Sequence, residues 1–62
     1  MLEYKIKYTY EGQEIAREFK NKKQAIKYYI ELLEAPAEDI TSLAILKNNK
    51  DITTSINKFL FN

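Results

Sequence analysis

The first ten residues alternate between apolar and polar side chains. Across residues 2–10 the even positions hold leucine, isoleucine or tyrosine, and the odd positions hold glutamate, lysine or threonine. A period of two with aromatic and β-branched side chains predicts a strand with one buried face. Glu11 and Gly12 then predict a turn, and residues 13–20 predict a second strand that completes a hairpin.

The register of this hairpin can be tested against its side-chain pairs. A two-residue loop at Glu11-Gly12 places apolar residues opposite each other on one face and opposite charges on the other, and each such pair contributes about 0.2–1 kcal/mol. The pairs are Tyr4–Phe19, Tyr8–Ile15, Lys5–Glu18 and Glu3–Lys20. A shift of one residue would mix the two faces. A four-residue loop would keep the same pairing, so the turn type stays open.

Residues 22–34 predict a helix. Asn21 precedes Gln24 by three residues, which is the spacing of a capping box. Apolar side chains then recur every three or four residues. They are Ile26, Tyr29, Ile30 and Leu33. Pro36 ends the helix, because a proline disfavours helical geometry in the residue before it.

Residues 40–47 predict a third strand. Its centre is almost continuously apolar, which suits a strand covered on more than one side. Two asparagines follow, and asparagine tolerates the positive φ of a tight turn. A fourth strand that starts at Asp51 would place Ile52 opposite Ile45.

The apolar spacing of residues 53–61 fits a helix and a strand equally well. We favour a short helix, because Thr53 or Thr54 can cap it and Phe59 and Leu60 would pack as one ridge. Residues 1–62 are therefore predicted as a single small α+β domain of order ββαββ(α). Its four-stranded mixed sheet is covered on one face by the main helix.

The chain has 62 residues and contains neither cysteine nor histidine. Disulfides and the usual zinc sites are therefore excluded, and so are the commonest catalytic bases and nucleophiles. With a single glycine, the chain also lacks a phosphate-binding loop of the usual glycine-rich kind. We expect a protein that is not an enzyme and binds no cofactor.

Targeting signals and membrane spans in the sequence would indicate the cellular compartment of the protein. The N-terminus does not lead from basic residues into an apolar stretch, and no apolar run is long enough to span a bilayer. We expect a cytoplasmic protein without a membrane partner. Nine lysines, eight isoleucines and five asparagines indicate AT-rich codons and hence a low-GC host.

The net charge of +1 is smaller than that of most dedicated nucleic-acid binders. The predicted topology nevertheless separates the charges. If the second and third strands run parallel, five lysines gather at one end of the sheet and form a basic pole: Lys20, Lys22, Lys23, Lys47 and Lys50. The opposite acidic pole would hold Glu11, Glu14, Glu34, Glu38 and Asp39. Solvated loop lysines are the simpler interpretation.

Arg17, the only arginine, shares the face of Tyr4 and Tyr8 in the predicted hairpin. These three side chains are candidates for a specific contact, such as stacking on nucleic-acid bases. The alternative is that the tyrosines cover the core beneath the helix while the arginine lies over one of their rings. We consider this structural role the better interpretation.

The outward face of the third strand is either the Leu43/Ile45 set or the Ala44/Leu46 set, so an apolar patch would lie beside the charged face of the first hairpin. Such patches usually mark protein interfaces. We therefore expect a protein-interaction module with a protein partner or self-association, such as a phage or mobile-element accessory or inhibitor protein. The alternatives are a nucleic-acid accessory protein that uses the basic pole, and a structural or designed domain without a ligand.

Overall fold

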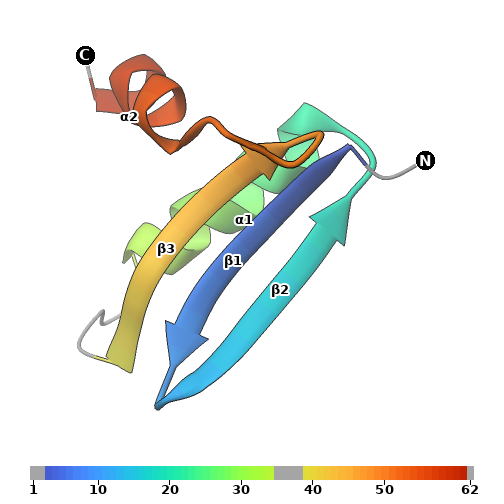
Figure 1. The fold of residues 1–62 in the computed structure, drawn as a ribbon. Coiled ribbons are helices and arrows are strands. Elements are labelled where there is room, and N and C mark those ends of the chain that lie inside the picture. Colours follow the sequence, from blue (N-terminus) through green and yellow to red (C-terminus); the bar gives the residue numbers. More distant parts are fainter. Residues whose placement is uncertain (1–2, 35–38, 62) are drawn as a thin grey trace.

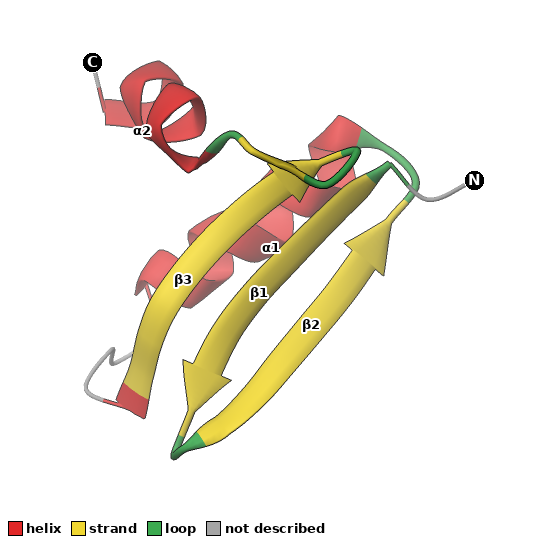
Figure 2. Ribbon diagram, in the orientation of Figure 1, coloured by secondary structure: helices red, strands yellow, loops and turns green. Residues whose placement is uncertain are grey.

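The computed structural model describes residues 3–34 and 39–61, which form one sheet and two helices (Figures 1 and 2). The elements are β1 (Tyr4–Tyr10), β2 (Gln13–Phe19), α1 (Lys22–Glu34), β3 (Ile40–Lys47), β4 (Lys50–Asp51) and α2 (Thr53–Phe61). The α+β class and the ββαββα order are confirmed, and the ambiguous C-terminal segment is a helix.

The first hairpin has the predicted register. Tyr10 pairs with Gln13, so the loop contains only Glu11 and Gly12, whose φ angles are 49° and 81°. Two successive positive φ angles are the geometry of the tight turn whose twist matches that of the flanking strands. Glycine at the second position adopts this conformation without a steric penalty, and it thereby fixes the register of the whole hairpin.

The strand order is β2-β1-β3-β4, and every neighbouring pair is antiparallel. The prediction of a mixed sheet is therefore wrong. β2 and β3 do run in the same direction, but β1 lies between them, since the second edge of β1 accepts β3. The chain passes from β2 along α1, behind the sheet in Figure 1, and returns through β3 in a right-handed crossover.

A bulge interrupts the pairing of β1 with β3. Between Lys7 and Thr9 of β1, β3 carries one extra residue, and Ser42 there has a φ of 55°. The extra residue changes which positions face inward, so Ile40 and Ile45 both contact the core although their positions differ by five, an odd number. The Ala44/Leu46 set consequently faces away from α1.

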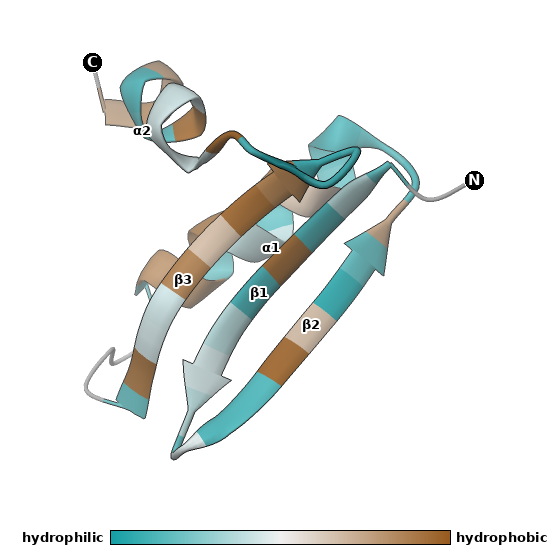
Figure 3. Cartoon of the chain, viewed as in Figure 1, coloured by the Kyte–Doolittle hydropathy of each residue, from teal (hydrophilic) through white to brown (hydrophobic). Residues whose placement is uncertain are grey.

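The core lies between the sheet and α1, and α2 closes it at one side. It consists of Tyr4, Ile6, Tyr8, Ala25, Tyr29, Ile45 and Ile56. Figure 3 shows the alternating hydropathy of β1 and the more continuous apolar colour of β3. The Oδ1 atom of Asn21 accepts a hydrogen bond from the Gln24 backbone N–H at 2.9 Å, so α1 has the predicted cap.

The C-terminal segment is tied to β3 by hydrogen bonds. β4 starts at Lys50, one residue before the predicted start, and ends before Ile52, yet the Ile52 N–H still donates to the Ile45 carbonyl at 2.9 Å. Thr53 does not cap α2. Its hydroxyl accepts from the Ile45 N–H at 3.0 Å, whereas the Asp51 carboxylate accepts from the Thr53 N–H at 2.8 Å. These bonds position α2 beside the β3 edge.

Candidate functional site

The predicted basic pole lies at one end of the sheet. Tyr4 pairs with both Phe19 and Lys47, so the end of β2, the start of α1 and the β3–β4 turn are close to each other. Two of its lysines lie over aromatic rings. Lys47 Nζ is 5.7 Å from the centroid of Tyr4, and Lys22 Nζ is 5.6 Å from that of Phe59.

The acidic residues gather toward the other end of the sheet. The Glu11 N–H donates a hydrogen bond to the Asp39 carbonyl at 3.2 Å, which joins the first turn to the start of β3. Glu14 follows in β2 and Glu34 ends α1. Glu38 lies outside the described residues. The antiparallel β1–β3 pairing thus brings Glu11 of the first turn close to Asp39, which directly precedes β3.

The three candidates for a specific contact lie on the sheet face that α1 covers, where the two tyrosines are buried and Arg17 stays exposed. Tyr4 and Tyr8 are only 6% and 8% exposed. Tyr8 and Tyr28 share a hydrogen bond between their hydroxyls at 2.8 Å, and the guanidinium carbon of Arg17 lies 5.9 Å from the centroid of Tyr28. Burial, together with the Tyr8 hydrogen bond, raises the pKa of Tyr28 above 10.0. This arrangement favours the structural role.

The two phenylalanines of α2 are the most exposed of the large apolar side chains in the described part of the chain. Phe59 and Phe61 are each 71% exposed. Because they are two residues apart, about 200° separates them around the helix, and they lie on either side of the inward-facing Ile56 and Leu60. The prediction that Phe59 and Leu60 form one packed ridge is therefore wrong.

A hollow of about 460 Å³ lies between the last turn of α1 and α2. Its lining is Leu33, Thr54, Asn57, Lys58 and Phe61. Beneath it, the Tyr29 hydroxyl donates a hydrogen bond to Asn57 Oδ1 at 2.7 Å, and burial raises the pKa of Tyr29 above 10.0. We use the name α2 surface for Lys22, Leu33, Lys58, Phe59 and Phe61.

The sequence contained a signal for this surface that periodicity alone did not resolve. α2 carries four large apolar residues among nine, and only Ile56 and Leu60 are directed into the core. One side of a short helix cannot bury side chains that are spread around most of its circumference. An excess of apolar residues over the width of the buried stripe therefore predicts exposure.

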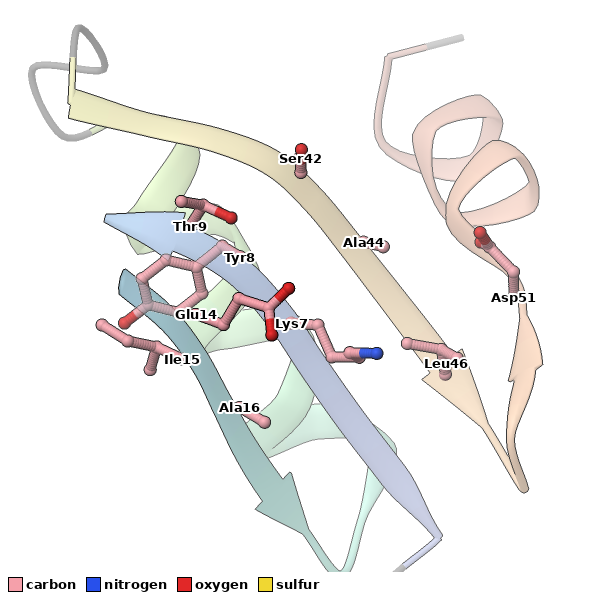
Figure 4. A pocket seen from close by; sticks show the side chains of 10 residues that line it. All are labelled: Lys7, Tyr8, Thr9, Glu14, Ile15, Ala16, Ser42, Ala44, Leu46 and Asp51. Carbon is pink, nitrogen blue, oxygen red and sulfur yellow. The ribbon is translucent and has the colours of Figure 1, made fainter. Parts of the chain in front are cut away.

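The sheet face opposite α1 is uncovered, and we call it the open face. A groove of about 480 Å³ runs along it, and Figure 4 shows Ala16, Ala44 and Leu46 around the extended side chain of Lys7. Other residues of the face are charged or small: Lys5, Thr9, Glu14, Glu18, Ser42 and Asp51. The strand aromatics all lie on the core face, so the open face offers no ring for base stacking.

Within residues 3–34 and 39–61, no three carboxylates gather closely enough to hold a metal ion. Neither α1 nor α2 is long and apolar enough to cross a membrane. Comparisons with protein-family models, curated proteins and solved structures found no match to the chain, so no activity can be transferred to it from a relative.

Proposed function

We propose that the protein is a non-catalytic interaction module that docks through its α2 surface onto a larger protein. The observation that carries this proposal is the 71% exposure of both Phe59 and Phe61. A phenylalanine buries about 150–250 Å² of surface when it is fully covered, so two exposed rings represent a large unused gain of free energy. Aromatic side chains are also enriched at the centres of protein interfaces.

The charges around these rings define the chemistry of the partner. Lys58 is the only charged residue within α2, and the Lys22 ammonium lies 5.6 Å from the centroid of Phe59. At about 100° per residue, Lys58 lies between the two rings on the outward side of α2, so the α2 surface combines exposed rings with positive charge between and beside them. It is complementary to a receptor surface that offers apolar pockets together with carboxylates.

Absence of catalysis is part of the proposal. A module with this composition acts by occupying a surface on its partner, as small inhibitor and accessory proteins of phages and mobile elements do. We place it in the cytoplasm of a low-GC host, in line with its composition.

The test compares the wild-type chain with the Phe59→Ser/Phe61→Ser variant in capture from a lysate of the source cells. Binding is then measured with the purified captured protein. Since interface aromatics often contribute 2 kcal/mol or more, we expect affinity to fall by at least about 30-fold. Both rings are exposed, so the thermal midpoint should change little.

Tyr10→Ser is the matched control, because Tyr10 is 42% exposed and lies at the opposite end of β1 from the basic pole. This variant should bind as the wild type does. Equal binding by the double phenylalanine variant would refute the proposed surface.

A second candidate function is nucleic-acid binding through the basic pole. The supporting observation is that the β1–β2 and β1–β3 registers bring Lys20 and Lys47 to the same end of the sheet. Such binding depends on phosphate neutralisation and weakens steeply with salt. A mixed-sequence oligonucleotide should bind the wild-type chain at low salt and not the variant with Lys20, Lys22 and Lys23 changed to glutamate. A flat titration at low salt would exclude this function.

A further inference from the structure

The five lysines of the basic pole are exposed, and the described carboxylates do not neutralise them. The one ion pair between described residues is Lys5–Glu18, which involves none of the five. Two further carboxylates lie near the pole. Glu3 precedes β1, and Asp51 ends β4 with its carboxylate bonded to the Thr53 N–H. The pole therefore keeps a net positive charge that attracts an anion.

The pole has the width of a short stretch of single strand. The registers place Phe19, Tyr4, Lys47 and Lys50 in one row across the sheet, with Lys20 directly after Phe19. Neighbouring strands lie about 4.8 Å apart, so this row of four strands is about 14 Å wide. At a rise of about 3.4 Å per nucleotide in a stacked strand, the width corresponds to about four phosphates.

α2 adds an exposed aromatic ring to the pole. The start of α1, the β3–β4 turn and α2 lie toward the same end of the sheet (Figure 1), and Lys22 Nζ lies 5.6 Å from the centroid of Phe59. Phe59 is 71% exposed, whereas Tyr4, whose ring lies near Lys47, is only 6% exposed. Among the described residues, Phe59 thus provides the ring beside a pole lysine that a ligand can reach.

We propose that the basic pole and Phe59 form a binding site for single-stranded nucleic acid, in which the lysines contact phosphates and one base stacks on the Phe59 ring. Sites for single strands combine these two elements, a cationic track for the backbone and an aromatic ring for the bases. The bases of a duplex are already stacked on one another, so an exposed ring favours a single strand.

An acidic protein segment suits the pole less well. Protein interfaces usually have an apolar centre with charges at the rim. Neither hollow described above is lined by a lysine of the pole, so neither offers a pocket for an apolar anchor among these charges. A phosphate backbone needs no such pocket, because its affinity comes from charge neutralisation and from stacking.

The inference rests on the second candidate function and not on docking through the α2 surface. Docking uses Phe59 and Phe61 together, whereas stacking at the pole uses Phe59 alone. Phe61 lines the hollow beside Leu33, which lies about 16 Å along α1 from Lys22. The two phenylalanines are equally exposed, so they form a matched pair for a test.

The test measures the fluorescence anisotropy of a labelled oligothymidylate, about twelve nucleotides long, at about 50 mM salt. Phe59→Ser should weaken binding at least about fivefold, because it removes the stacked ring. Phe59→Trp keeps an aromatic face and should bind as the wild type does, whereas Phe59→Leu is apolar without a ring and should bind weakly. Phe61→Ser is the control and should leave binding unchanged. Circular dichroism confirms the folding of each variant.

Salt dependence separates the phosphate contacts from the stacking. Each lysine that meets a phosphate of a single strand contributes about −0.7 to the slope of log affinity against log salt, so four contacts give a slope of about −3. Lys47→Gln/Lys50→Gln should make the slope shallower by about 1.4, and Phe59→Ser should leave it unchanged. A duplex of the same length should bind through phosphates alone, with equal affinity for the wild type and Phe59→Ser.

The outcomes distinguish the inference from the function on which it rests. If the oligothymidylate does not bind at low salt, both fail. If it binds with the expected slope but Phe59→Ser and Phe61→Ser have the same effect, the stacking site is refuted and phosphate binding stands. If polyglutamate competes equally well at the same concentration of charges, the pole is a site for an acidic protein segment, which would overturn the inference.

Discussion

The β1–β2 hairpin and α2 both carry more apolar side chains than polar ones on one side, but they differ in how many of those side chains they bury. In β1, alternation directs Tyr4, Ile6 and Tyr8 to the core, where each is less than 10% exposed. In α2, Ile56 is 4% exposed while Phe59 and Phe61 remain 71% exposed. The hairpin uses its apolar residues for stability, and α2 divides them between stability and a surface.

The difference follows from the two periodicities. A strand has only two faces, so a strict alternation assigns every apolar residue to one of them. A helix turns by about 100° per residue, so apolar residues at neighbouring positions point in several directions. We infer that the hairpin belongs to the most stable part of the molecule and that α2 is attached by a few specific contacts.

The largest expected effect separates the two regions directly. Ile6 is fully buried in the central strand, so Ile6→Ala should cost about 3–4 kcal/mol, most of the stability of so small a domain. Ile56→Ala should cost about 2 kcal/mol, because α2 can partly detach while the sheet and α1 stay folded. Urea denaturation measures both costs, and hydrogen exchange shows whether α2 amides open before those of the sheet. Equal costs with simultaneous opening would make α2 part of the same cooperative unit.

An intermediate effect is expected at the contact between the helices. Asn57→Ala removes the acceptor of the Tyr29 hydroxyl. Tyr29 is only 2% exposed, so its hydroxyl would be left unpaired, and the free energy of unfolding should fall by about 1–3 kcal/mol. Adding Tyr29→Phe should restore part of this loss. Tyr8→Phe, the matched change on the hairpin side, should cost less, because Tyr28 keeps the cation of Arg17 near its ring. A double-mutant cycle by thermal unfolding distinguishes these outcomes.

The smallest expected effect is a loss of α2 stability at low pH. Hydrogen bonds from the Thr53 hydroxyl and N–H lower the pKa of Asp51 below 3.8. A carboxyl whose pKa is lowered in the folded state stabilises that state above its unfolded pKa, and the contribution disappears as pH falls through the folded value. The protection factors of α2 amides, which correct for the pH dependence of intrinsic exchange, should therefore fall below pH 3.8, with those of sheet amides less affected. Asp51→Asn should remove this difference; an unchanged acid dependence in that variant would assign it to other carboxyls.

The hairpin and α1 were predictable because their signals are local. The pairing of Tyr8 with Ile15 follows from alternation and turn length, and the limits of α1 follow from Asn21 and Pro36. The antiparallel β1–β3 pairing was not predictable, because the apolar pattern of a strand indicates which face is buried but not which edge accepts a neighbouring strand. Ser42 gave no warning of its bulge either, since a positive φ is unusual for serine.

The candidate surfaces were predictable to different degrees. The grouping of Lys20 with Lys47 follows from the common direction of β2 and β3, which the predicted crossover already required. The exposure of Phe59 and Phe61 was not predicted, because it depends on where α2 docks and hence on hydrogen bonds from β3. Whether the Leu43/Ile45 set or the Ala44/Leu46 set of β3 faces outward depended on the bulge at Ser42, which the sequence did not predict.

The central position of β1 has a consequence for the order in which the fold can assemble. β1 can pair with β2 as soon as residue 19 is available, because only a two-residue loop must close. Its other edge stays empty until Lys47 arrives, after α1 has been made. During synthesis the first hairpin therefore has an unpaired inner edge while residues 20–47 are made. That edge is where a nascent or misfolded molecule would recruit another strand.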